Sequence, residues 1–90
     1  MDREQDNETK RNELAERFGS DLLFADGFDC AIIGVACGHD SGRVVYDCEK
    51  MVKAFMKSNG CDYEESLEFL EFNTFGAYVG DNTPLYLWRE

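Results

Sequence analysis

The middle third of the chain alternates between apolar runs and a polar turn, a pattern that predicts two strands. Residues 30–37 are apolar at every position, as in a strand covered on both faces. Residues 43–46 are rich in β-branched and aromatic side chains, which favour strands. The glycine-bracketed segment 38–42 is typical of a hairpin connection. We therefore expect an antiparallel hairpin in which 30–37 is the central strand of the sheet.

Helical spacing replaces the strand pattern after Asp47. Asp47 suits an N-cap and Gly60 suits a left-handed helix stop. Between them, apolar residues recur at the spacing of one helix face, namely Cys48, Met51, Val52 and Phe55. The opposite face carries Lys50, Lys53 and Lys57. The pattern predicts a helix over 48–59 that packs against the strand containing Ile32 and Ile33.

A second helix is predicted to follow at once. Asp62 suits its N-cap, and Glu65 stands three residues later, as in a capping box. The short connection between the two helices predicts a helical hairpin. After a turn over 81–84, residues 85–88 read as a final strand.

The N-terminal part carries a weaker helical pattern. Leu14, Ala15 and Phe18 lie at helical spacing after Thr9, and Gly19 is placed to end the helix. Residues 1–8 are polar without periodicity, which predicts a frayed tail before a single domain over 9–90. Together the elements predict an α+β fold. We expect a small antiparallel sheet of about three strands, with the helical hairpin packed on one face, the weaker N-terminal helix beside it and the last strand next to the first.

The charge of the chain adds to this picture, because the chain is strongly acidic and its charged residues are unevenly distributed. The 90 residues have a net charge of -10, and residues 61–90 contribute seven acids and one base. Such a chain is repelled by nucleic acid and attracted to basic surfaces, so we expect no direct nucleic-acid binding. No apolar run is long enough to cross a bilayer, and the N-terminus lacks the pattern of a secretory signal. These features predict a cytoplasmic protein without membrane contact.

The cysteines point to free thiols. In a reducing cytoplasm Cys30, Cys37, Cys48 and Cys61 are expected to stay reduced. Their intervals of 7, 11 and 13 residues contain none of the close pairs of structural zinc sites. Cys37 and His39 are the sole conceivable ligand or catalytic pair, and no motif surrounds them. We therefore predict no metal, no cofactor, no catalytic residue and no enzyme activity.

Several short motifs resemble a known group of proteins. They are Val44-Val45-Tyr46-Asp47, Tyr63-Glu64-Glu65, Glu71-Phe72-Asn73, Gly76-Ala77-Tyr78-Val79-Gly80 and Thr83-Pro84. Over roughly residues 26 to 88, this pattern resembles a family of short uncharacterised bacteriophage and bacterial proteins. At Cys61-Asp62 the chain departs from the family, in which Met followed by Ser or Thr is expected. The resemblance implies a viral origin and no particular activity, so it transfers no functional residue.

The most specific candidate site lies on the second helix. At helical spacing Tyr63, Leu67, Leu70 and Thr74 form the inner stripe, with Phe69 at its margin. Phe72 and Phe75 fall instead on the side of Glu65, Glu68 and Glu71. Either other segments cover the two rings, or Glu68, Glu71, Phe72 and Phe75 form an acidic, aromatic surface for a partner protein.

Three functions are compatible with these observations. The first is a small acidic protein-interaction module, phage-encoded, which binds a partner protein without catalysis. The second is an acidic mimic of nucleic acid that inhibits a host DNA-binding or defence protein. The third is a small metal- or thiol-dependent enzyme, which the residue inventory disfavours. A homodimer, in which the lysine row meets the acidic face of a second copy, stays open.

Overall fold

The chain folds as a small mixed α+β structure. The computed structural model describes residues 3–19, 21–25 and 27–89. The helices and strands are α1 (Arg3–Phe18), β1 (Ile32–Val35), β2 (Val44–Asp47), α2 (Cys48–Asn59), α3 (Tyr63–Leu70) and β3 (Leu85–Leu87). Short 3₁₀ turns occupy Asp29–Ala31 and Gly38–Asp40, and a π-helical turn, η3 (Glu71–Phe75), continues α3. The α+β class, with three strands, a helical hairpin and an N-terminal helix, is as predicted.

The sheet has the order β1-β2-β3, so β2 is the central strand and the prediction that 30–37 is central was wrong. The β1–β2 hairpin is antiparallel as predicted, with Val35 opposite Val44. The last strand pairs with β2 rather than β1, and in parallel, with Tyr46 opposite Tyr86. The two helices between β2 and β3 make this possible, because a crossover connection carries the chain back to the same end of the sheet.

β1 is also shorter and less covered than predicted. The first two residues of the predicted strand, Cys30 and Ala31, lie instead in a 3₁₀ turn, and the pairing of β1 is irregular between Ile32 and Gly34. Ile32 is buried in the core, whereas Ile33 is 44% exposed. β1 is therefore buried on one face only. Ile33 lies on the exposed face and does not pack against α2, contrary to the prediction.

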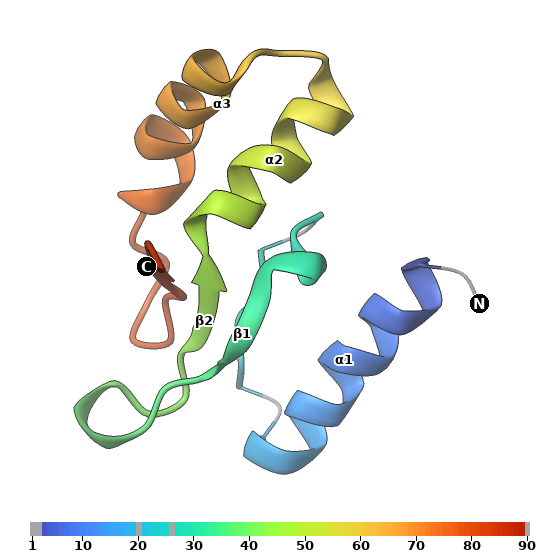
Figure 1. The fold of residues 1–90 in the computed structure, drawn as a ribbon. Coiled ribbons are helices and arrows are strands. Elements are labelled where there is room, and N and C mark those ends of the chain that lie inside the picture. The colour runs from blue at the N-terminus through green and yellow to red at the C-terminus, as the bar shows by residue number, and fades with distance from the viewer. Residues whose placement is uncertain (1–2, 20, 26, 90) are drawn as a thin grey trace.

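The two helices of the hairpin begin and end where the caps predict. The Asp47 carboxylate accepts a hydrogen bond from the Lys50 backbone N–H at 3.2 Å, and Asp62 accepts one from Glu65 at 2.8 Å. Gly60 ends α2 in the left-handed conformation with φ +67°, which costs glycine no side-chain clash. Figure 1 shows α2 leading directly out of β2, with α3 running back beside it.

The core lies between the hairpin, the inner sheet face and the segment after α1. Its fully buried centre contains Val44, Tyr46, Met51, Val52 and Leu70. Met51 and Val52 occupy the predicted inner face of α2, while Phe55 is half-buried and stacks on Phe69 of α3 with ring centroids 4.7 Å apart. The inner face of α2 thus points into the core as predicted, but α2 packs mainly against α3 and the 3₁₀ turn Asp29–Ala31 and not against Ile33.

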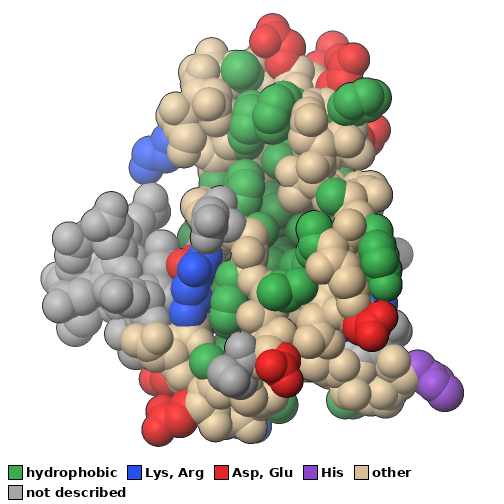
Figure 2. Space-filling view, turned by 180° about the vertical axis from the view of Figure 1, so that it is seen from behind, with side chains coloured by type: hydrophobic (Ala, Val, Ile, Leu, Met, Phe, Trp, Pro, Cys, Tyr) green, Lys and Arg blue, Asp and Glu red, His purple; other side chains and the backbone are tan. Residues whose placement is uncertain are grey.

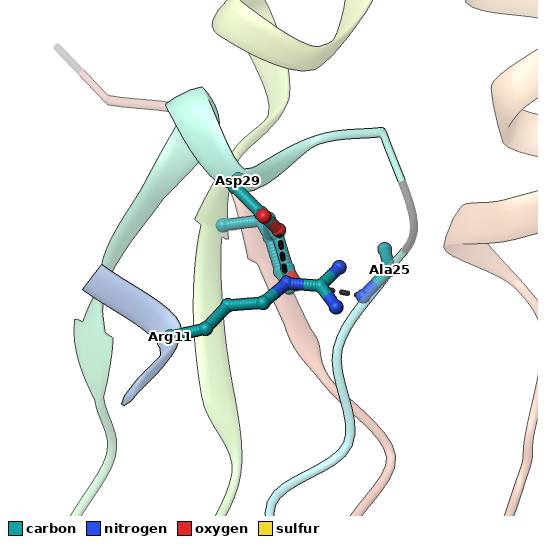
Figure 3. A network of polar contacts seen from close by, with 4 residues as sticks. Arg11, Ala25 and Asp29 are labelled. Carbon is teal, nitrogen blue, oxygen red and sulfur yellow. Dashed lines mark hydrogen bonds and ion pairs between the residues drawn. The ribbon is translucent and has the colours of Figure 1, made fainter. Parts of the chain in front are cut away.

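α1 begins at Arg3 in the structure, earlier than the start near Thr9 that the apolar pattern predicted. Residues 3–8 are therefore helical where a tail was expected, and residues 1 and 2 lie outside the described part. Arg11 fastens α1 to the rest of the molecule: its Nε donates to Asp29 Oδ1 at 2.7 Å (Figure 3), and its guanidinium lies 5.0 Å from the Phe24 ring centre. Within the described ranges, no helix has the length and hydropathy needed to cross a membrane.

Candidate interaction surface

The outer side of α3 and η3 presents acidic side chains to solvent. Asp62 orients the first turn of α3, and the carboxylates that follow, Glu64, Glu65, Glu68 and Glu71, are all exposed. Two of them, Glu64 and Glu65, lie in the first turn, where the helix dipole favours negative charge. From residue 58 to residue 88 the sequence contains no lysine or arginine, so no base of this segment neutralises the row.

The side chain of Phe72 lies in this acidic surface and is almost fully exposed to solvent. Its exposed fraction is 88%, the highest of the large apolar residues in the described part of the chain. Phe69, one turn earlier, is 48% exposed because one face of its ring stacks on Phe55. We call Glu68, Glu71 and Phe72 the α3 face.

Phe75 does not belong to the α3 face, although the helical spacing placed it there. Its ring is half-buried, 5.1 Å from the Tyr86 ring and 6.4 Å from the Trp88 ring between centroids. The π turn over Glu71–Phe75 explains the difference. Because i→i+5 bonding puts more residues into one turn, each residue advances by a smaller angle, and Phe75 ends on the inner side. Of the four predicted site residues, the structure thus brings three together.

A second surface feature is an open groove beside β3, which the sequence did not reveal. Its cavity measures about 410 Å³. Four aromatic rings line it, from Phe75, Tyr78, Tyr86 and Trp88, together with Arg43 and the buried Cys48. We call this feature the aromatic groove. Tyr86 and Trp88 are two residues apart, which is the spacing of side chains on one face of a strand. From this spacing, two of the four rings of the groove could have been predicted to lie together.

The connection 76–84 forms one wall of the groove, and hydrogen bonds of Thr83 hold it in place. Thr83 Oγ1 accepts a hydrogen bond from the Val79 N–H at 2.9 Å and donates to the Gly80 carbonyl. Arg43 Nε donates to the Thr83 carbonyl at 2.6 Å, which ties the connection to the start of β2. Thr83 and Pro84 are themselves buried. The wall of the groove is therefore held in the fold by hydrogen bonds within the connection 76–84 and by one from Arg43.

A third hollow lies between the segment after α1 and the same connection. It encloses about 320 Å³ and is lined mainly by apolar atoms, including those of Leu23, Phe24, Val79 and Pro84. Asn82 Nδ2 donates to the Asp21 carbonyl at 2.9 Å and so joins its two sides. Figure 2 shows hydrophobic side chains gathered along the middle of one face of the molecule, between polar rims.

The four cysteines differ in their exposure to solvent. All four cysteines are free: Cys30 and Cys37 are exposed, Cys61 is half-buried and Cys48 is buried. Burial and, to a smaller extent, the neighbouring Asp47 carboxylate together raise the pKa of the Cys48 thiol to about 11, so this thiol stays protonated at neutral pH. Within residues 3–19, 21–25 and 27–89, no group of three or more His, Cys, Asp or Glu side chains is placed to hold a metal ion.

The lysine row of α2 is exposed, as its spacing predicts. Lys50, Lys53 and Lys57 all point to solvent, and Lys53 lies 3.9 Å from Glu49 in an i, i+4 pair. Such an exposed pair contributes at most a few tenths of a kcal/mol. Glu49 also accepts a hydrogen bond from the Tyr63 hydroxyl at 2.8 Å, which links α2 to the start of α3.

Comparison with known proteins gives no relative from which a role could be transferred. No family model, no curated protein and no solved structure matches this chain.

Proposed function

We propose that this protein is a small acidic protein-interaction module that binds a partner protein through the α3 face and catalyses no reaction. One observation carries the proposal: Phe72 is 88% exposed among acidic side chains on the π turn that continues the capped helix α3. A phenylalanine so placed gains free energy when a partner removes it from water. Aromatic residues of this kind are typical anchors of protein interfaces.

The charge around Phe72 indicates the character of the partner. Glu68 and Glu71 flank the ring, and the whole chain carries a net charge of -10. A basic protein surface with an apolar recess would meet both features, because charge steers the encounter while the ring supplies most of the affinity. In line with the resemblance to bacteriophage proteins, we propose that the protein is viral and acts in the host cytoplasm.

The proposal is tested by capture on the immobilised protein from a lysate of the cells in which it is made. We expect Phe72→Ala to abolish capture of the partner and Ile33→Ala to leave it unchanged. Ile33 is the matched control, since it is a 44% exposed apolar residue on β1, away from α3. Equal capture by all three proteins would show that the α3 face is not the interface.

Salt distinguishes this function from mimicry of nucleic acid. Replacing Glu68 and Glu71 by Gln should weaken capture at low ionic strength only, because rim charges are screened as salt rises. A partner held by Phe72 should remain bound at raised salt. If raised salt releases the partner completely while Phe72→Ala still binds it at low salt, the acidic row acts as a nucleic-acid mimic instead.

A further inference from the structure

The aromatic groove has a chemistry of its own, distinct from the α3 face. Two of its rings stand well out into solvent: Tyr78 is 74% exposed and Trp88 is 51% exposed. Phe75 lies between Trp88 and Tyr86, edge-on to the indole with an interplanar angle of 81°. The groove therefore offers a row of flat apolar surfaces at different angles, open along one side.

Two polar groups of the groove are able to donate hydrogen bonds to a ligand. Within the described residues, neither the indole N–H of Trp88 nor the hydroxyl of Tyr86 has a hydrogen-bond partner. Arg43 also lines the groove, where its Nε donates to the Thr83 carbonyl. A ligand that suits this groove presents apolar rings and hydrogen-bond acceptors.

We propose that the aromatic groove binds a proline-rich segment of a partner protein in the polyproline II conformation. Proline supplies flat apolar rings and a backbone carbonyl, and it has no N–H that would need an acceptor when the segment is buried against the rings. The polyproline II helix has no internal hydrogen bonds, so its carbonyls remain free to accept from Trp88 and Tyr86. Aromatic-lined grooves are the recurring solution for binding such segments.

The charge outside the groove adds a requirement on the flanks of that segment. The Tyr78 hydroxyl donates to Asp81 Oδ1 at 3.3 Å, which places a carboxylate at the rim, and the protein as a whole is strongly acidic. Lysine or arginine next to the proline run, rather than within it, would therefore strengthen binding at low salt. This site does not depend on the function proposed for the α3 face.

Trp88 provides the test, because it is the only tryptophan in the chain and lies in the groove. The probe is a synthetic run of prolines flanked by arginines, titrated while tryptophan emission is recorded. The comparison peptide has alanine in place of every proline. We expect a saturable change in emission with the proline peptide and at least a roughly tenfold weaker response with the alanine peptide, about 1.4 kcal/mol.

Two variants separate this site from the α3 face. Tyr78→Ala removes an exposed groove ring without touching the core, and we expect it to weaken the peptide about tenfold or more. Phe72→Ala should bind the peptide like the unchanged protein. No saturable response up to about 1 mM peptide, an equal response to both peptides, or a Tyr78→Ala variant with full affinity would each overturn the proposal.

Discussion

Among the described residues, Ser66 is the exception in an interior whose other buried polar side chains have hydrogen-bond partners. It is fully buried on the inner side of α3, and its Oγ has no hydrogen-bond partner, alone among the buried side-chain oxygen and nitrogen atoms of the described residues. Leaving a buried hydroxyl unpaired costs about 1 to 3 kcal/mol. A small side chain is nevertheless required here, because the helix is closely packed on this side.

We expect Ser66→Ala to raise the free energy of unfolding by about 1 kcal/mol or more. Alanine also favours helix over serine, so Ser58→Ala, at an exposed position near the end of α2, is the control for propensity and should change stability by about 0.5 kcal/mol at most. Urea unfolding of both variants makes the comparison. A loss of stability in Ser66→Ala would show that the hydroxyl has a partner, such as a buried water.

Tyr46 links stability to alkaline pH. Its fully buried hydroxyl accepts a hydrogen bond from the Ala25 N–H at 2.7 Å, and burial raises its pKa from 10.0 to about 12. The stabilising effect of the protonated form is complete below pH 10, where the unfolded chain also keeps this proton. It is lost as pH rises from 10 to about 12, because only the unfolded chain then releases it.

The free energy of unfolding should therefore fall by roughly 2 to 3 kcal/mol between pH 10 and 12 on account of Tyr46. Tyr46→Phe cannot ionise, so its stability curve should be flatter over this interval, although lower at neutral pH because the Ala25 N–H loses its acceptor. Denaturant unfolding at several pH values measures both slopes. Parallel curves for the two proteins would contradict this account of Tyr46.

At the scale of elements, the π turn after α3 separates two phenylalanines that are three residues apart. Phe75 packs on Tyr86 and Trp88, whereas Phe72 is left in solvent. Phe75→Ala should therefore cost about 2 to 3 kcal/mol, as truncation of a packed aromatic does. Phe72→Ala should cost less than about 0.5 kcal/mol. Similar losses in the two variants would mean that Phe72 is also covered in solution.

The elements that could be predicted are those whose signals are local. Asp47, Gly60 and Asp62 mark the ends of α2 and α3 because capping depends only on neighbouring backbone groups. The π turn could not be predicted, since it brings Phe75 onto Tyr86 of β3 and onto Trp88 just after β3, which are distant from it in the sequence. The early start of α1 was missed for another reason: residues 3–8 are polar, so they show no apolar periodicity, yet Arg, Glu and Gln favour helix.

At the scale of the whole molecule, the order of the strands could not be predicted from the sequence. The apolar run at 30–37 suggested a central strand, but β2 takes that place because β3 returns beside it through the two-helix crossover. The sequence of residues 85–87 does not indicate which strand they pair with. Helical spacing placed Glu68, Glu71 and Phe72 on the outer side of α3 and η3, where all three are exposed, and their role as a partner surface stays a prediction. The aromatic groove was missed because it is formed by η3, the connection 76–84 and β3.

The central claim is that Phe72 anchors a partner protein, and the affinity of the isolated partner for Phe72→Ala tests it most directly. Calorimetric titration of the variant and the unchanged protein should give dissociation constants about 30-fold apart, equivalent to about 2 kcal/mol, with the same unfolding midpoint. Equal dissociation constants for the two proteins would contradict the claim.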